Sequence, residues 1–162
     1  MNSDFYTASI LPHAGIIIKL CRAYTNTQDD FEDYYQEVCL QIWRSSDSFK
    51  EQSEWSTWIY RLTLNVCMTL LKKSKNNQKF ASDYQVSEAV EDRCPFADES
   101  LNQLYDAIKQ LSELDRGIIL LYLEEQSYQQ IAEIFETNAN NIGVRVKRIK
   151  ERLRVILDEK VD

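Results

Sequence analysis

Turn-forming and chemically reactive residues are scarce in this chain of 162 residues. It holds three glycines and two prolines, and no alternation of apolar and polar residues bounded by turn residues stands out, so we expect an all-helical fold. A single histidine, His13, and four cysteines without a C-x-x-C pair argue against a zinc site and a disulfide scaffold. They also offer no clustered nucleophile, base or metal set. We therefore expect reduced thiols, no metal, no cofactor and no enzymatic activity.

Long apolar runs are lacking as well. No stretch approaches the ~18 apolar residues of a membrane-spanning helix, and the N-terminus lacks the charged-then-apolar order of a signal peptide. With 28% charged and 44% hydrophobic residues, the composition is that of a globular rather than a disordered chain. We expect a cytoplasmic protein without membrane insertion that is monomeric when free.

Basic residues are distributed unevenly, although the formal net charge is -7. Residues 57–80 hold five basic residues and no acidic one, and residues 137–154 hold six basic residues and one acidic residue. The remaining segments are acidic. Two separate basic segments in an acidic chain suggest two contacts with one polyanion, and chance clustering is the alternative.

Apolar spacing predicts three helices in the N-terminal half, at about 10–25, 29–45 and 54–74. Thr27 and the acids after it form a start signal for the second helix. The polar face of that helix is acidic and amide-rich, which is typical of a solvated surface or of a docking face for a basic partner. The expected buried residues are Phe31, Tyr35, Val38, Cys39, Ile42 and Trp43 in the second helix and Trp55, Trp58, Ile59, Leu62, Val66 and Leu70 in the third.

The third helix also has a polar, cationic side. At 100° per residue, Thr57, Arg61, Asn65 and Lys72 share one face, and Phe49 lies in the polar loop before the helix. Aromatic rings beside cations suit exposed bases on a negatively charged backbone. A core helix with a solvated basic end is the alternative interpretation.

Residues 77–97 are polar, weakly periodic and contain Pro95, which predicts a flexible linker. We expect two small helical domains, at 8–76 and 98–159, on either side of it. Each is small but feasible as a helical unit.

The C-terminal part has the pattern of a helix-turn-helix. Capping-box patterns at Ser112 and Ser127 open two helices, and a long basic helix follows at about 139–156. Glu136 stands where many such turns have glycine, which adopts a left-handed backbone more readily. The last helix could enter the major groove of DNA, whereas a helical hairpin with a basic exterior is the alternative. The outward side chains would include Asn140, Lys147 and Arg148. The side chains expected inside are Ile118, Ile119, Leu121, Tyr122 and Leu123 from the helix that Ser112 opens, Ala132 at the helix crossing, and Ile142, Val146, Ile149, Leu153 and Ile156 from the last helix.

The two halves together resemble a bacterial extracytoplasmic-function (group IV) sigma factor of RNA polymerase. EDYYQEVCLQIW at 32–43, DSF at 47–49 and WSTWIYRLTLN at 55–65 are similar to sigma region 2, and the stretches 107–135 and 144–153 are similar to sigma region 4. The resemblance implies a protein that binds core RNA polymerase, recognises promoter DNA, helps to open it, and is controlled by an anti-sigma factor. A helix-turn-helix regulator that acts without polymerase is the alternative.

The resemblance also implies roles for particular residues. Gly143 and Val144 depart from the polar or basic residues often found nearby, so it does not imply which minus-thirty-five sequence is read. The implied sites are Asp33, Gln36, Glu37 and Gln41 for core polymerase, Phe49, Arg61, Asn65, Lys72 and Lys73 for the minus-ten region, and Asn140, Arg145, Lys147 and Arg148 for the minus-thirty-five element.

Overall fold

The computed structural model describes residues 2–80 and 98–161, and every regular element in these ranges is a helix. The prediction of an all-helical fold is therefore confirmed. The described residues form two compact units, one of 2–48 with 62–80 and the other of 49–61 with 98–161. The linker predicted at 77–97 lies outside the described residues except for its first four positions, which continue a long helix.

The chain becomes helical earlier than the sequence predicts. Asn2 caps the first turn, because its side-chain oxygen accepts a hydrogen bond from the N–H of Asp4 at 3.0 Å. Pro12 lies in a 3-10 turn, where its missing N–H is tolerated. The helix expected from residue 10 thus has an extra N-terminal portion of irregular pitch. The elements are α1 (Ser3–Phe5), the π-helical turn η1 (Tyr6–Ile10), the 3-10 turn η2 (Leu11–His13) and α2 (Ala14–Ala23).

The second predicted helix is α3 (Gln28–Ser45), followed by the short turn η3 (Ser46–Ser48). The start signal is confirmed, since the Thr27 hydroxyl accepts from the N–H of Asp30 at 3.0 Å. Its predicted core face is right except at its edges. Trp43 is 40% exposed, and Tyr35 is half-buried and shares a hydroxyl–hydroxyl hydrogen bond of 2.7 Å with Tyr6.

The third predicted helix is α4 (Trp55–Phe80), and its predicted core stripe is wrong by about one residue position. Of the six residues expected inside, Ile59 alone is buried, whereas Thr57, expected on the polar face, is 4% exposed. The prediction placed the largest apolar side chains of α4 in the core, but the buried side of this helix is centred on smaller ones. No buried side-chain nitrogen or oxygen in the described ranges lacks a hydrogen-bond partner, so burial of threonine hydroxyls is not penalised. The buried residues of α4 are Thr57, Ile59, Tyr60, Thr63, Leu64 and Cys67.

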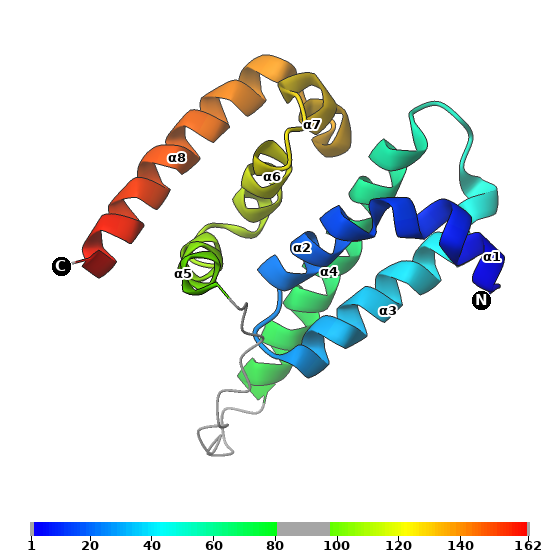
Figure 1. Cartoon of the computed structure of the whole chain (residues 1–162), viewed down its shortest axis with the longest axis horizontal. Coiled ribbons are helices and arrows are strands. Elements are labelled where there is room, and N and C mark those ends of the chain that lie inside the picture. Colours follow the sequence, from blue (N-terminus) through cyan, green and yellow to red (C-terminus); the bar gives the residue numbers. More distant parts are fainter. Residues whose placement is uncertain (1, 81–97, 162) are drawn as a thin grey trace. The chain divides into compact units, whose positions relative to one another are not determined.

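Three thiols lie in the core of the first unit, where α2, α3 and α4 lie side by side (Figure 1). Cys21, Cys39 and Cys67 are buried and free, and the Sγ atoms of Cys21 and Cys67 are 3.9 Å apart. Burial raises the pKa of the Cys39 thiol to about 11. These cysteines therefore act as small apolar core residues. Cys94 lies outside the described residues.

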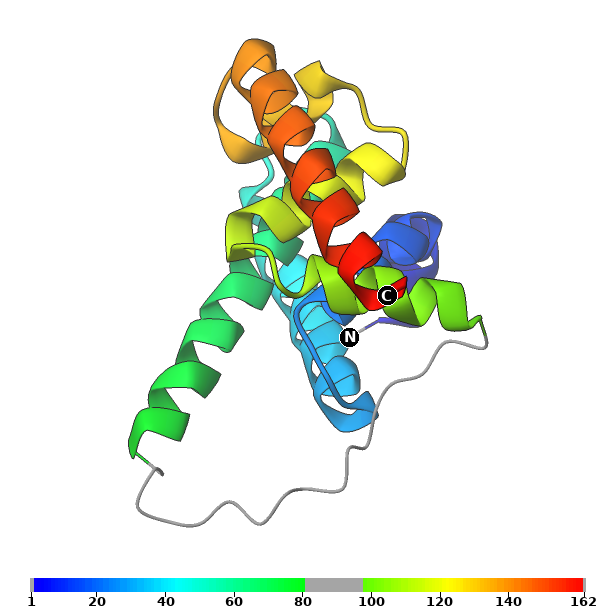
Figure 2. The same cartoon turned by 90° about the vertical axis from the view of Figure 1, so that its left-hand side faces the viewer.

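The second unit contains the predicted helix-turn-helix. Ser127 and Gln130 form a reciprocal capping box, in which each side chain accepts a hydrogen bond from the other residue's backbone N–H. At Ser112 the side chain accepts from the N–H of Asp115 at 3.3 Å. Figures 1 and 2 both show α7 beside the N-terminal end of α8, the longer of the two helices. The elements are α5 (Glu99–Ile108), α6 (Glu113–Leu123), α7 (Tyr128–Phe135) and α8 (Ala139–Val161).

The core of this unit follows the predicted periodicity closely. Leu123, expected inside, is 46% exposed, and Tyr122 is half-buried. The other apolar positions predicted for α6 and α8 are buried, as is Ala132, whose small side chain suits a helix crossing. The buried residues of α8 are Ile142, Val146, Ile149, Leu153 and Ile156.

Candidate nucleic-acid and partner interfaces

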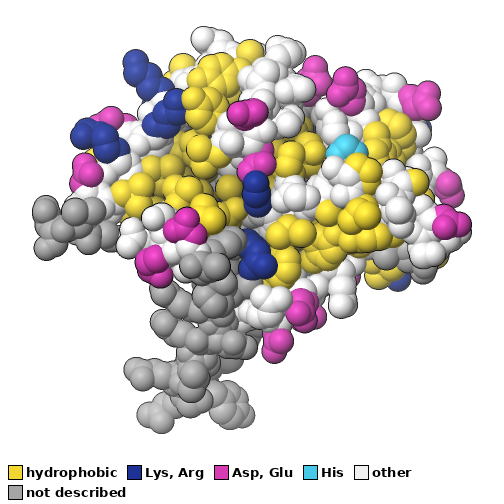
Figure 3. Space-filling view, viewed as in Figure 1, with side chains coloured by type: hydrophobic (Ala, Val, Ile, Leu, Met, Phe, Trp, Pro, Cys, Tyr) yellow, Lys and Arg dark blue, Asp and Glu magenta, His cyan; other side chains and the backbone are white. Residues whose placement is uncertain are grey.

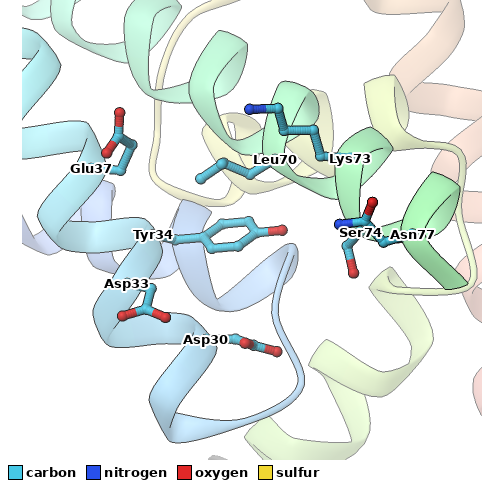
Figure 4. A pocket seen from close by; sticks show the side chains of 8 residues that line it. All are labelled: Asp30, Asp33, Tyr34, Glu37, Leu70, Lys73, Ser74 and Asn77. Atoms are coloured by element: carbon cyan, nitrogen blue, oxygen red, sulfur yellow. The ribbon is translucent and has the colours of Figure 1, made fainter. Parts of the chain in front are cut away.

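The acidic face of α3 borders a hollow between α3 and α4, of about 530 Å³. Figure 4 shows the Tyr34 side chain pointing from α3 toward α4 inside it. Burial, with smaller contributions from the Cys67 thiol and the charge of Asp30, raises the pKa of Tyr34 to about 12, so this phenol stays protonated well above neutral pH. The lining residues are Asp30, Asp33, Tyr34 and Glu37 from α3 and Leu70, Lys73, Ser74 and Asn77 from α4.

A second hollow of about 410 Å³ adjoins the first and brings two sets of predicted site residues together. Glu37 and Gln41, assigned to polymerase, line it with Asn65 and Lys73, assigned to the minus-ten region. Gln41 Nε2 donates to Glu37 Oε1 at 3.1 Å, which orients the α3 edge. The floor consists of the half-buried Leu62, Val66 and Leu70. The second half of the stripe that the sequence assigned to the core is thus the apolar lining of a groove with an acidic edge and a basic edge. We call the two hollows together the α3–α4 groove.

The residues assigned to polymerase and to the minus-ten region lie in both units. The exposed ones in the first unit are Asp33 and Gln36 on α3 and Asn65, Lys72 and Lys73 on α4. Arg61 is partly buried in the second unit, where its guanidinium donates to the backbone carbonyl oxygens of Glu133 and Ile134. Carbonyls in the last turn of a helix lack intrahelical partners, so Arg61 caps the end of α7.

Phe49 is held by a cluster of three aromatic rings in the second unit. Its ring lies edge-on to Trp55 with centroids 5.1 Å apart and is tilted against Trp58 at 5.7 Å. Trp55 and Trp58 stack at 4.9 Å. All three are half-buried. The sequence offered no partner for Phe49, because its two partners were assigned to the core.

Three of the four residues that the sequence assigned to the minus-thirty-five element lie on the outer face of α8. Asn140, Lys147 and Arg148 are exposed, and Figure 3 shows Lys and Arg side chains grouped over α8. Asn138 caps the helix through a hydrogen bond from the N–H of Asn141 at 2.9 Å. The turn before it is tight, because Glu136 adopts a left-handed conformation with φ 57° and ψ 46°. The helix-turn-helix geometry is thus present even though its turn lacks glycine.

One flank of α8 holds an ion pair that the sequence did not predict. Arg145 Nη1 lies 3.1 Å from Asp115 Oδ1, in the first turn of α6. Beside this pair lies a hollow of about 510 Å³, whose lining is apolar on the α6 side and mixed apolar, polar and cationic on the α8 side. It is lined by Leu114, Ile118, Phe135, Thr137, Asn141, Ile142, Val144, Arg145 and Arg148. No local signal marks Asp115 as a partner of Arg145, since the two are 30 residues apart.

Two tyrosines from neighbouring helices, Tyr122 of α6 and Tyr128 of α7, lie against the opposite flank of α8. The ring of Tyr122 stacks on Tyr128 at 6.0 Å, and the ammonium of Lys150 lies 4.3 Å from the centroid of Tyr122. A Cβ atom at Gly143 would lie 3.3 Å from Cε2 of Tyr128. The departure at Gly143 from the usual polar residues therefore has a packing reason.

In residues 2–80 and 98–161 no three His, Cys, Asp or Glu side chains are grouped so that they could hold a metal ion. Among the helices of the described part, none is long and apolar enough to cross a membrane.

These features define a DNA-binding protein of two helical units, with a helix-turn-helix in the second and a charged groove in the first. Each half of the chain matches the model of a known protein family. Residues 10–77 match the family model Sigma-70 region 2, and residues 101–153 match Sigma-70, region 4. The chain belongs to the bacterial extracytoplasmic-function sigma factors of RNA polymerase.

Individual relatives agree with this assignment. The chain is 29% identical over 140 residues to the ECF RNA polymerase sigma-E factor of Haemophilus influenzae, covering 78% of this chain and 74% of that one. It is 26% identical over 151 residues to the ECF RNA polymerase sigma factor SigW of Bacillus subtilis, covering 85% and 81%. The fold matches that of the sigma factor RpoE of Bartonella quintana, solved with the anti-sigma factor NepR, at a TM-score of 0.75 with 21% identity, covering 97% and 98%.

Proposed function

We propose that this sigma factor binds core RNA polymerase through α3, the opened minus-ten strand through Phe49 and α4, and the minus-thirty-five element through α8. The observation that carries the proposal is the outer face of α8, where exposed Asn140, Lys147 and Arg148 follow a tight left-handed turn. This is the arrangement with which a recognition helix enters the major groove. The polymerase does the chemistry, and the sigma factor itself has no catalytic role.

The acidic edge of α3 favours binding of a protein partner rather than of DNA. Asp33 and Glu37 border the α3–α4 groove, and carboxylates there would repel phosphates but attract a basic helix. The relatives' names pair sigma factors with RNA polymerase, and its core enzyme is the partner we assign to this face.

The basic edge of α4 supports a single-stranded partner. Asn65, Lys72 and Lys73 are exposed on it, so amide and ammonium groups are available for a base and for the sugar–phosphate backbone. Phe49, held by Trp55 and Trp58, presents a ring that is already ordered and loses little entropy on stacking.

An anti-sigma factor is the regulatory partner we propose. Among the structural neighbours, the sigma factor RpoE was solved with the anti-sigma factor NepR, and CnrH was solved with the cytosolic domain of CnrY. We further propose that the protein acts in the cytoplasm, where polymerase and promoters are.

Reconstituted transcription tests the proposal. Purified protein added to core polymerase should give transcripts that start at discrete promoters, selected from fragments of the source genome. Asp33→Ala should weaken the binding of core polymerase by about 1 kcal/mol or more, whereas the matched Asp29→Ala, in the first turn of the same helix, should have little effect.

Failure to direct promoter-specific initiation with cognate core polymerase would contradict the proposal. Tight binding of the isolated protein to duplex DNA, combined with insensitivity to Asp33→Ala and Gln36→Ala, would favour a regulator that acts without polymerase.

A further inference from the structure

Val144 is an apolar side chain on the side of α8 that we propose faces DNA. It is 45% exposed, whereas Val146, two positions on, is 1% exposed and belongs to the core. A β-branched residue at an exposed helix position lowers helix stability slightly relative to alanine, lysine or arginine. Val144 thus contributes neither core packing nor helix propensity.

The surroundings of Val144 distinguish it from a scattered surface residue. It lines the hollow beside α6 together with Leu114, which is 37% exposed. Its neighbours one helical turn away are Asn140 and Arg148, both exposed. An apolar spot therefore lies among the polar and cationic side chains of the proposed recognition face.

The ion pair between Arg145 and Asp115 lies on the flank of this spot. Asp115 holds the guanidinium of Arg145 at 3.1 Å, toward α6. Side chains at adjacent helix positions do not face each other, so Arg145 does not cover the valine, which is 45% exposed between Asn140 and Arg148.

The major groove of DNA offers one apolar group, the C5-methyl of thymine, and apolar side chains contact it in specific complexes. We propose that Val144 is a specificity-determining residue that reads a thymine methyl group in the upstream promoter element. This inference rests on the proposed function, because it takes α8 as the recognition helix. It concerns a position where this chain departs from the resemblance, so its preference is a property of this chain.

Replacing thymine by uracil in the DNA removes only the methyl group, and this gives a direct test. Duplexes are first selected from a randomised upstream element with the reconstituted holoenzyme. Each thymine of the selected element is then replaced singly by uracil, and holoenzyme affinity is measured. For the wild type we expect one replacement to lower affinity about fourfold, which corresponds to about 0.8 kcal/mol for one buried methyl group.

Two variants assign this loss to a residue. In Val144→Ala the same replacement should have almost no effect, and the variant should bind the thymine duplex about as weakly as the wild type binds the uracil duplex. Alanine is the better helix former, so this variant should fold. The matched control is Val155→Ala, which removes an equally exposed valine (47%) three turns further along α8, roughly 16 Å away. It should retain the fourfold loss.

The outcomes separate the inference from the proposed function. Selective binding without sensitivity to any thymine methyl group, or a loss that persists in Val144→Ala or vanishes in Val155→Ala, would overturn the inference and leave the proposed function intact. If holoenzyme selects no upstream element at all, recognition through α8 is wrong, and the inference is wrong with it.

Discussion

Arg145 of α8 and Asp115 of α6 form an ion pair of 3.1 Å across the second unit, and it fixes one of the four side chains assigned to the minus-thirty-five element. Both groups are partly solvent-exposed, with side-chain exposures of 46% and 28%. Such a pair contributes at most about 1 kcal/mol to stability. Its effect should therefore appear in the placement of Arg145 rather than in folding.

Asp115→Asn tests this role. The change frees Arg145 and removes a negative charge near the proposed DNA surface, so binding to unrelated duplexes should strengthen. The ratio of specific to non-specific affinity should fall about threefold to tenfold, as expected when a base contact worth about 1–3 kcal/mol is partly misplaced. Melting temperature should change little. Competition binding of holoenzyme measures the ratio, and Glu125→Gln, with an equal change in net charge, should leave it unaltered.

The substitution Asn65→Ala distinguishes a role of this residue in promoter opening from a structural role. Asn65 is exposed on the edge of the α3–α4 groove, so its loss should change the free energy of unfolding by less than about 0.5 kcal/mol. The rate of promoter opening should fall about tenfold, equivalent to about 1.4 kcal/mol, a typical value for a hydrogen bond lost to a base. Permanganate footprinting of the opened strand follows the rate. Thr69→Ala, one turn further along the same groove, is the control, and a large drop in the melting temperature of Asn65→Ala would mean that Asn65 is structural.

Glu136→Gly should stabilise the helix-turn-helix. Glu136 has a φ of 57°, a left-handed conformation that costs a non-glycine residue about 1–2 kcal/mol. Glycine avoids that cost but loses more entropy on folding, so we expect a net gain of about 0.5–1 kcal/mol in urea unfolding. Glu136→Ala is the matched variant, because it removes the carboxylate and keeps the strain. Equal stabilities of the two variants would show that the backbone conformation at 136 is not strained.

Alkaline pH should destabilise the first unit through Cys39. Burial raises the pKa of this thiol to about 11 from an ordinary value of 9.0, so the folded state retains its proton where the unfolded chain releases it. The contribution to stability is complete below about pH 9 and is lost as the pH rises toward 11, by about 2 kcal/mol in total. Urea unfolding with a reducing agent, from pH 8 to 11, measures this decline. Cys39→Ala should show a shallower decline, and identical slopes would refute the assignment.

The sequence predicts those features of the structure that depend on residues close together in the chain. The core of α8 was predicted correctly, because Ile142, Val146 and Ile149 recur at the helical period with polar residues between them. The start of α3 at Thr27 was predicted for a similar reason, since a helix cap is a contact within one turn. Such features need no knowledge of the neighbouring helices.

The core of α4 was not predicted correctly, because its large side chains are not its most buried ones. Trp58 and Leu62 are half-buried, in the aromatic cluster and the groove floor respectively, whereas Thr63 is fully buried. Hydrophobicity alone ranks these residues in the wrong order. Which side of a helix faces the core is decided by the helices packed against it, and one sequence does not contain that placement in local form.

The joint lining of the α3–α4 groove was beyond the sequence for the same reason. Glu37 and Lys73 each carry an obvious charge, but they are 36 positions apart and meet only because α3 and α4 pack together. The ion pair of Arg145 with Asp115 is a second example. Individual residues of the candidate interfaces were accessible from the sequence, whereas their neighbours were not.

The close approach of Tyr128 to Gly143 bears on how this sigma factor could change its promoter preference during evolution. Any side chain at position 143 would bring a Cβ atom to 3.3 Å from the tyrosine ring, so the ring would have to move before a new contact to DNA could form. Substitutions at 140, 144, 147 and 148 meet no such obstacle, because those side chains are exposed. New specificities should therefore arise on that side of α8, whereas any side chain at position 143 also requires the Tyr128 ring to shift by a few tenths of an ångström.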